Sequence, residues 1–96
     1  MLNKLFNRNR DISNVELIFL SREECHLCDT ALAVVEKVRR RFPFRLRVVK
    51  IEEGDEWYQE YWDKIPVGIV DGAMIFKYHI EPDDLLGKLR ARAREN

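Results

Sequence analysis

Apolar residues recur with two different periods along this chain, and the change of period marks the predicted elements. Residues 15–20 are mostly apolar, with several β-branched or aromatic side chains, which predicts a strand buried on both faces. From Leu27 to Arg41 apolar residues recur every three or four positions, as in a helix with one buried face. The expected buried stripe consists of Leu27, Ala31, Val34, Val35 and Val38. Pro43 ends this helix, after a basic last turn that suits the helix dipole.

The middle of the chain contains a second strand and a short aromatic segment. Residues 44–51 alternate at first and then become apolar, which predicts a strand whose arginines face solvent. Residues 56–62 carry aromatic side chains at helical spacing, so we expect a short helix whose aromatic stripe packs on the core. The stripe consists of Trp57, Tyr58, Tyr61 and Trp62.

The last third of the chain predicts a hairpin followed by a helix. Residues 64–70 and 73–78 are strand-like, and Asp71–Gly72 between them is a strong two-residue turn signal. A final helix begins near Pro82, because proline is favoured at the first helical position. The order is therefore β-α-β-α-β-β-α. It predicts an α/β fold with a four-stranded mixed sheet and helices on its faces.

Composition limits the domain count and the classes of partner. The chain has 96 residues, of which 46% are hydrophobic and 35% charged, which fits one small domain over residues 15–94 after a polar tail over 1–14. The formal net charge is zero, so overall charge gives no reason to expect nucleic acid or a membrane as partner. No apolar run reaches membrane-spanning length, and the first residues are too polar for a secretory signal. We expect a cytoplasmic monomer.

Both cysteines lie in one short motif, Cys25-x-x-Cys28, between the first predicted strand and the first predicted helix. Unpaired backbone N–H groups and the helix dipole at a helix start favour a thiolate, which is the nucleophile in disulfide exchange. Cys28 would lie one turn further along, where its sulfur can attack a mixed disulfide on Cys25. Cys25 is expected to be exposed, because charged residues flank the motif. A close pair without a signal peptide also indicates a reducing compartment.

Other interpretations of this pair concern metal binding and simple burial. Zinc needs four ligands, and one chain offers only the two cysteines with His26 and His79, in a spacing unlike common zinc sites. We expect no metal within a monomer. The functional alternative to redox turnover is a binding module, whose thiols serve an iron–sulfur or zinc centre or a partner protein. The simplest interpretation is that the two cysteines are ordinary buried residues without a function.

The positions of these motifs relative to the predicted elements resemble a known family. With the Cys25–Cys28 pair at a helix start and Ile65–Pro66 opening the third strand, the chain resembles glutaredoxin-like members of the thioredoxin superfamily from about Val15 to Arg90. More narrowly, residues 21–29, 64–67 and Asp71–Gly72 resemble the small glutaredoxin-like proteins of the DUF836 type. The resemblance implies a thioredoxin-like, glutaredoxin-type fold and thiol–disulfide oxidoreductase activity.

The resemblance also implies roles for individual residues. Cys25 corresponds to the attacking thiol and Cys28 to the resolving thiol, and Pro66 corresponds to a proline after a cis bond. The backbone of Ile65 would then pair with an extended substrate, such as a peptide or glutathione. Arg22 falls where glutaredoxins carry a lysine, and its charge would favour a thiolate and attract a carboxylate. His26 next to Cys25 would also favour the thiolate when protonated.

Several departures from the family pattern concern glutathione. Glutaredoxins carry a Gly-Gly pair after the fourth strand, whereas this chain has Phe76, Lys77 and Tyr78 there. His26 stands where proline is usual, and Glu23 and Glu24 place acids beside the thiol. We therefore expect glutathione to bind weakly as a reductant, with a protein or small-molecule disulfide as substrate and glutathione or a reductase as electron donor.

The sequence also contains a basic cluster, which is Lys37, Arg39, Arg40 and Arg41 with Arg45 and Arg47. A surface for nucleic acid or an acidic protein is the functional interpretation of these residues. Because cations at a helix end have a structural reason and the net charge is zero, we expect no nucleic-acid partner.

Overall fold

The computed structural model describes residues 10–93, and its elements follow the predicted order. They are β1 (Glu16–Ser21), α2 (His26–Arg41), β2 (Arg45–Lys50), α3 (Tyr58–Tyr61), β3 (Val67–Val70), β4 (Ala73–Lys77) and α4 (Pro82–Arg92). The predicted β-α-β-α-β-β-α arrangement is confirmed, and most element ends agree with the sequence pattern to within three residues.

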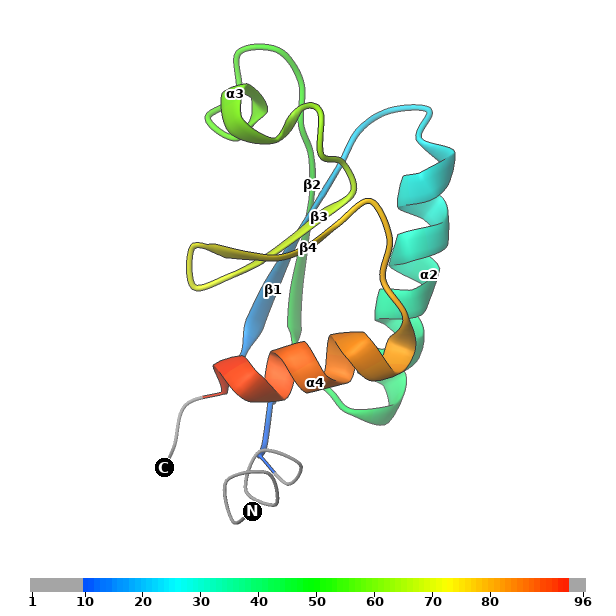
Figure 1. The fold of residues 1–96 in the computed structure, drawn as a ribbon, viewed down its shortest axis with the longest axis vertical. Coiled ribbons are helices and arrows are strands. Elements are labelled where there is room, and N and C mark those ends of the chain that lie inside the picture. The colour runs from blue at the N-terminus through cyan, green and yellow to red at the C-terminus, as the bar shows by residue number, and fades with distance from the viewer. Residues whose placement is uncertain (1–9, 94–96) are drawn as a thin grey trace.

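The strands form one mixed sheet in the order β2-β1-β3-β4 (Figure 1). β1 pairs in parallel with β2, and α2 connects the two strands as a crossover helix. β3 pairs antiparallel with both β1 and β4. The connection between β3 and β4 is the predicted turn, in which Asp71 and Gly72 both have positive φ, 50° and 77°. This topology places the start of α2 and the start of β3 at the same end of the sheet.

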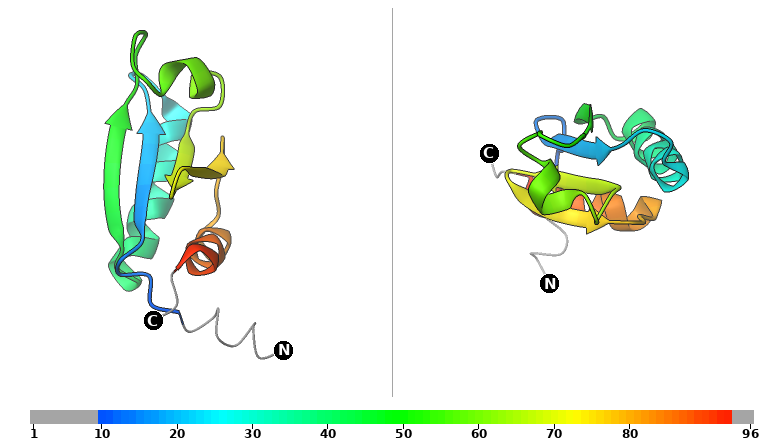
Figure 2. Two further views of the ribbon diagram at one scale, coloured as in Figure 1. Left: turned by 90° about the vertical axis from the view of Figure 1, so that its left-hand side faces the viewer. Right: turned by 90° about the horizontal axis from the view of Figure 1, so that it is seen from above.

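Two apolar clusters lie on opposite faces of the sheet. Leu17 and Phe19 of β1 pack with α2 and α4, and Figure 2 shows both of these helices on one side of the sheet. Leu20 packs in the second cluster with Tyr61 of α3, and Ile18 lies against that cluster. Successive side chains of a strand point to opposite faces, so β1 contributes to both clusters, as its sequence predicts.

Two apolar residues that the periodicity places in the core are exposed, and these predictions were wrong. Leu27 is 57% exposed and Trp62 is 55% exposed. The buried stripe of α2 is formed by Cys28, Ala31, Val35 and Val38, and Leu27, one residue before Cys28, is rotated about 100° from it. Trp62 follows the single turn of α3 and stacks on Tyr58, with ring centroids 6.4 Å apart.

The third strand is shorter than predicted, and the core extends beyond the predicted N-terminal boundary of the domain. β3 begins at Val67 rather than Lys64, because the preceding residues form a turn in which the Lys64 N–H donates to the Tyr61 carbonyl at 2.9 Å. Ile12, which the sequence places in the tail, is buried in the cluster beneath α2 and α4. The folded unit therefore includes at least part of the segment before residue 15. Of the tail predicted over residues 1–14, residues 1–9 lie outside the described residues.

Candidate functional site

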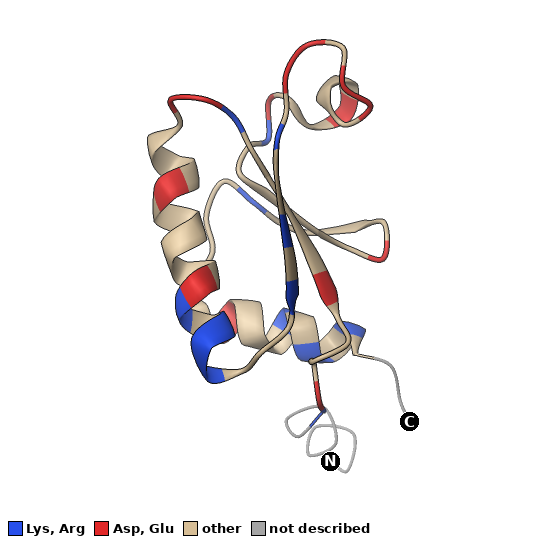
Figure 3. Ribbon diagram, turned by 180° about the vertical axis from the view of Figure 1, so that it is seen from behind, with Lys and Arg blue, Asp and Glu red and all other residues tan. Residues whose placement is uncertain are grey.

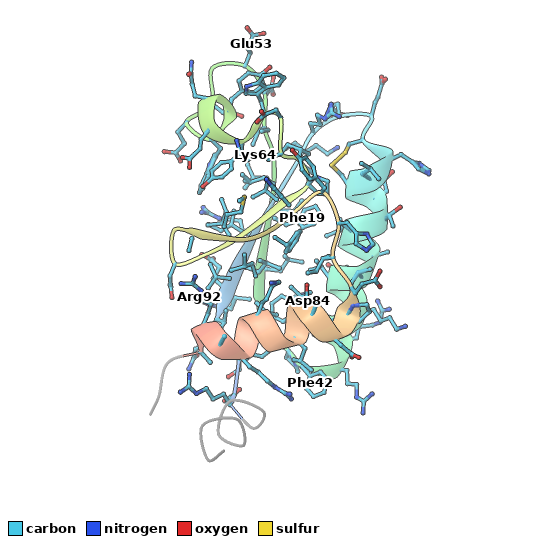
Figure 4. The ribbon with its side chains drawn as sticks, viewed as in Figure 1. Phe19, Phe42, Glu53, Lys64, Asp84 and Arg92 are labelled. Atoms are coloured by element: carbon cyan, nitrogen blue, oxygen red, sulfur yellow. A yellow bond between two sulfur atoms is a disulfide. The ribbon has the colours of Figure 1, made fainter. Side chains whose placement is uncertain are left out.

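Cys25 and Cys28 form a disulfide at the N-terminus of α2, drawn as a yellow bond in Figure 4. Cys25 is the N-cap residue, with an extended backbone, and its Sγ accepts a hydrogen bond from the Cys28 N–H at 3.1 Å. A side-chain acceptor at the N-cap satisfies one of the free N–H groups of the first helical turn. In the reduced protein the same N–H group and the helix dipole favour a thiolate on Cys25.

Both cysteines are more buried than the sequence indicates. Cys25 is 7% exposed and Cys28 is 4% exposed, although their charged neighbours lie on the surface. The expectation of an exposed Cys25 was therefore wrong for this disulfide form. The reason is packing: both cysteines belong to the second apolar cluster, together with Leu20, Tyr61 and Ile65. The disulfide lies at the edge of a core, beneath a polar loop.

α3 completes this cluster by placing Tyr61 in it. Burial raises the pKa of the Tyr61 phenol above its ordinary value, and the negative charge of Glu60 acts in the same direction. The phenol therefore remains neutral at physiological pH and packs as an aromatic side chain. The short helix that the aromatic stripe predicts thus contributes one side chain to the core around the disulfide, and Trp57 and Tyr58 pack against the cluster from outside.

The Ile65–Pro66 segment lies in the same region. Its peptide bond is cis, as the family resemblance implies. Ile65 packs in one cluster with Cys25 and Cys28, and Pro66 is almost fully buried. The fold therefore brings together the helix start and the residues before β3, which are about 40 positions apart in the sequence.

Arg22 and His26 are exposed, one in the loop between β1 and α2 and the other at the first position of α2. In the same loop, Glu23 pairs with Lys50 at 3.3 Å, and both side chains are largely exposed. Exposed pairs of this kind contribute little to stability. The structure thus places Arg22 and His26 in the segment that carries the disulfide, and their roles there stay predictions.

Tyr78 is a further site residue. It lies where the family resemblance implies a Gly-Gly pair. It has φ +68°, a left-handed conformation, and its N–H donates to the Pro66 carbonyl at 2.8 Å. Its hydroxyl donates to the Asp63 carbonyl at 3.0 Å. Tyr78 thus bonds to the chain on both sides of Ile65. Only the end of the strand near Tyr78 was detectable from the sequence, because a tyrosine gives no signal for a left-handed backbone.

Charged residues are unevenly distributed between the two ends of the molecule, although the net charge is zero and each end also carries some residues of the opposite sign (Figure 3). Acidic residues gather at the end where α2 begins, in the loops after β1 and β2 and in α3. Lysine and arginine gather at the other end, over the last turns of α2 and α4. The acidic residues between β2 and β3 are Glu52, Glu53, Asp55, Glu56, Glu60 and Asp63. The disulfide therefore lies at the acidic end.

The basic cluster of the sequence has structural contacts. Arg39 donates from Nε to the Phe44 carbonyl at 2.8 Å, which ties the end of α2 to the start of β2. Arg41 and Arg90 lie over the ring of Phe42, with guanidinium carbons 5.4 and 5.2 Å from its centroid. Such contacts are a common structural use of arginine at a helix end.

The four residues considered as zinc ligands do not come together. His79 precedes α4, and its Nε2 lies 2.7 Å from a carboxylate oxygen of Glu81. Within residues 10–93, no group of three or more His, Cys, Asp or Glu side chains has the geometry to hold a metal ion. None of the helices in this range is long and apolar enough to cross a membrane.

Comparison with known proteins shows matches over most of the chain. The sequence model of the glutaredoxin-like domain (DUF836) matches residues 16–90. A Dictyostelium discoideum protein named glutaredoxin-like protein YDR286C homolog is 31% identical over 101 residues, which cover 99% of this chain and 91% of that protein. All of the candidate site residues lie within the matched range.

Solved structures with the same fold come from several organisms. Protein XcR50 from X. campestris has a TM-score of 0.66 at 24% identity, covering 78% of this chain and 96% of that one. Protein Ne2328 from Nitrosomonas europaea also has a TM-score of 0.66 at 24% identity, covering 80% and 93%. Thioredoxin O2 from Arabidopsis thaliana, in its oxidized state, has a TM-score of 0.57 at 15% identity, covering 97% and 87%. At these identities the structures establish a thioredoxin-like fold.

Proposed function

Because the chain belongs to the glutaredoxin-like (DUF836) domain family, we propose that it is a thiol–disulfide oxidoreductase that cycles Cys25 and Cys28 between dithiol and disulfide. One observation carries this proposal. The two cysteines are bonded at the first turn of a helix, and the N-cap sulfur accepts a backbone N–H at 3.1 Å. This arrangement stabilises negative charge on Cys25, which the chemistry requires.

The reaction begins when the Cys25 thiolate attacks a substrate disulfide. A bond forms between Sγ of Cys25 and one substrate sulfur, and the other substrate sulfur leaves as a thiolate that takes up a proton. The Cys28 thiol then loses its proton, and its sulfur attacks Sγ of Cys25 and releases the second substrate thiol. The two electrons of the dithiol have then reduced the substrate, and the Cys25–Cys28 disulfide is the product on the protein. Glutathione or a reductase restores the dithiol.

The Ile65 backbone is the proposed contact for an extended substrate. Ile65 packs in the cluster that holds the disulfide and lies just before β3, so a substrate segment that pairs with its backbone lies beside Cys25. Arg22 and His26 are exposed in the segment that carries the disulfide, and we propose that they stabilise the thiolate. The exposed Leu27 between the two cysteines gives a protein substrate an apolar surface to pack against.

The charge distribution favours a protein disulfide over a glutathione mixed disulfide. Glutathione has two carboxylates and one ammonium group, so its net charge is negative near neutral pH, and the disulfide lies at the acidic end of the molecule. Of the cations at that end, Lys64 is already engaged with the Glu60 carbonyl at 2.9 Å and the Asp63 carboxylate at 3.1 Å, and Lys50 pairs with Glu23 at 3.3 Å. Arg22 is exposed there, and acidic residues outnumber it. We assign the protein to a reducing compartment such as the cytoplasm, where a thiol pair remains available for turnover.

A comparison of two substrates tests this proposal. We expect the protein to reduce a plain protein disulfide at least about tenfold faster than the glutathionylated form of the same protein, since both charge and shape disfavour glutathione. The measurement is the initial rate at which free thiols appear on the substrate protein, with dithiothreitol as the reductant in both reactions. If the protein accelerates neither reaction above the rate with dithiothreitol alone, the proposed activity is contradicted. If it turns over the glutathionylated protein preferentially, the substrate assignment is contradicted.

A further inference from the structure

Tyr78 has a backbone conformation that is unfavourable for a bulky side chain. Its φ of +68° lies in the left-handed region, which glycine adopts freely and which a tyrosine adopts at a cost in free energy. Residues in such conformations are held by their surroundings and occur often at functional sites. The neighbours of Tyr78 therefore indicate what holds the tyrosine in place.

Two hydrogen bonds connect Tyr78 to the segment that contains Ile65. The backbone N–H bonds to the Pro66 carbonyl at 2.8 Å, and the hydroxyl bonds to the Asp63 carbonyl at 3.0 Å. The tyrosine thus bridges the residues on either side of Ile65. Only the first bond uses the backbone of Tyr78 itself, and glycine at this position would retain it. The side chain is therefore not needed for the turn itself.

The side chain is exposed enough to meet a substrate. Tyr78 is 46% exposed, and Nζ of Lys77 lies 5.4 Å from the centroid of its ring. The hydrogen bond of its hydroxyl is also exposed, so water competes for it and its net contribution to stability is small. Exposed tyrosines at protein contacts provide a rigid apolar surface with few rotatable bonds. Tyr78 bonds to the residues on either side of Ile65, and its half-exposed ring therefore suits contact with a substrate better than it suits core packing.

The chemistry of this position distinguishes two classes of substrate. Glutathione is a small peptide with little apolar surface, so its recognition depends on donors to its carboxylates and on close approach to the protein backbone. At Tyr78 both donors, the N–H and the O–H, are bonded within the protein, and the ring occupies space that glycine would leave open. A protein disulfide has apolar side chains near its sulfur atoms, and these can pack on the ring.

We propose that Tyr78 is a specificity-determining residue, one that directs the Cys25–Cys28 couple toward disulfides in proteins and away from glutathione mixed disulfides. The inference rests on the proposed oxidoreductase function. It explains the proposed substrate preference by one residue. The ring of Tyr78 supplies a packing surface for protein substrates, and it keeps glutathione from approaching the protein backbone closely.

The test compares three variants on the two substrates described above. Replacing tyrosine with glycine, Tyr78→Gly, should raise kcat/KM for the glutathionylated protein about tenfold and lower it for the plain protein disulfide about fivefold, as expected for one aromatic contact. Tyr78→Phe keeps the ring and loses the hydroxyl, so it should keep the wild-type preference. Asp71→Gly is the matched control, because Asp71 also has a positive φ, 50°, but lies in the β3–β4 turn at the far end of β3 from Pro66. It should change neither rate constant.

A second measurement does not depend on turnover. In a Cys28→Ser background, the Cys25 thiol reacts with oxidised glutathione to give the mixed disulfide and one molecule of reduced glutathione. Intact-protein mass spectrometry at equilibrium gives the equilibrium constant, which should rise about fivefold or more when Tyr78→Gly is added, because the substitution removes the ring that blocks the approach of glutathione. This result supports the role of Tyr78 even if the protein reduces neither substrate catalytically.

Several results would overturn the inference. One is a ratio of the two kcat/KM values that stays within twofold of wild type in Tyr78→Gly, and another is an unchanged equilibrium constant in the Cys28→Ser background. Thermal unfolding of Tyr78→Gly checks for a merely structural role, and the midpoint should not fall, because glycine suits the backbone conformation. A lower midpoint together with equal losses on both substrates would identify Tyr78 as structural and overturn the assignment.

Discussion

The Cys25→Ser protein is expected to lose catalysed disulfide reduction by about three orders of magnitude or more, since serine cannot form the mixed disulfide on which the mechanism depends. The fold should persist, because serine is a favoured N-cap residue and its hydroxyl can accept the Cys28 N–H as Sγ does now. Circular dichroism and thermal unfolding confirm that the variant is folded. Turnover of a protein disulfide then measures the loss.

The Cys28→Ser protein should behave differently, because it keeps the attacking sulfur. It should form a stable mixed disulfide with the substrate through Cys25 and release little product, since the resolving sulfur is absent. Mass spectrometry of the trapped adduct identifies the bonded cysteine. An adduct on Cys28 in the Cys25→Ser protein, with none on Cys25 in the Cys28→Ser protein, contradicts the assigned roles.

Gly68→Ala is expected to destabilise the protein by about 2–3 kcal/mol, a large effect for the addition of one methyl group to a packed core. A Cβ at Gly68 would overlap the ring of Phe76, at a separation where real Cβ atoms are essentially never found. Phe76 cannot move aside easily, because it is buried and its ring packs at 6.2 Å from that of Phe19. Denaturant unfolding measures the change.

A double variant tests whether the Phe76 ring is the cause. In Gly68→Ala/Phe76→Leu the smaller side chain leaves room for the new methyl group, so the two substitutions should together cost less than the sum of their separate costs. Gly87→Ala is the matched control, because Gly87 lies in α4 with nothing within 4 Å of a new Cβ. It should stabilise the protein by about 0.5–1 kcal/mol. Additive costs in the double variant would exclude the ring as the cause.

The sequence predicts the fold well because its elements differ in period. The three- and four-residue spacing of α2 and the Asp71–Gly72 turn are local features, and local features determine helix and hairpin positions. The same periodicity failed at Leu27 and Trp62, which lie at the ends of their helices. There the orientation of a side chain depends on how the helix is placed on the sheet, which no local pattern specifies.

The site was only partly predictable. The cysteine pair and its helix start follow from the motif, and the position of Ile65 and Pro66 beside it came from the family resemblance. The burial of both cysteines and the bridge from Tyr78 to Asp63 and Pro66 depend on tertiary packing between segments distant in the sequence. Gly68 does have a signal in the sequence, since a glycine inside an apolar strand often marks close approach of another group.

A redox titration of the Cys25–Cys28 pair tests the central claim most directly. The protein is equilibrated in buffers of graded dithiol and disulfide content, quenched with acid, and the free thiols are counted by mass after alkylation. The proposed function predicts a two-electron transition with a midpoint between about −300 and −120 mV, the range of thiol–disulfide oxidoreductases. A pair that stays oxidised well below about −300 mV would be a structural disulfide, and that result would contradict the account.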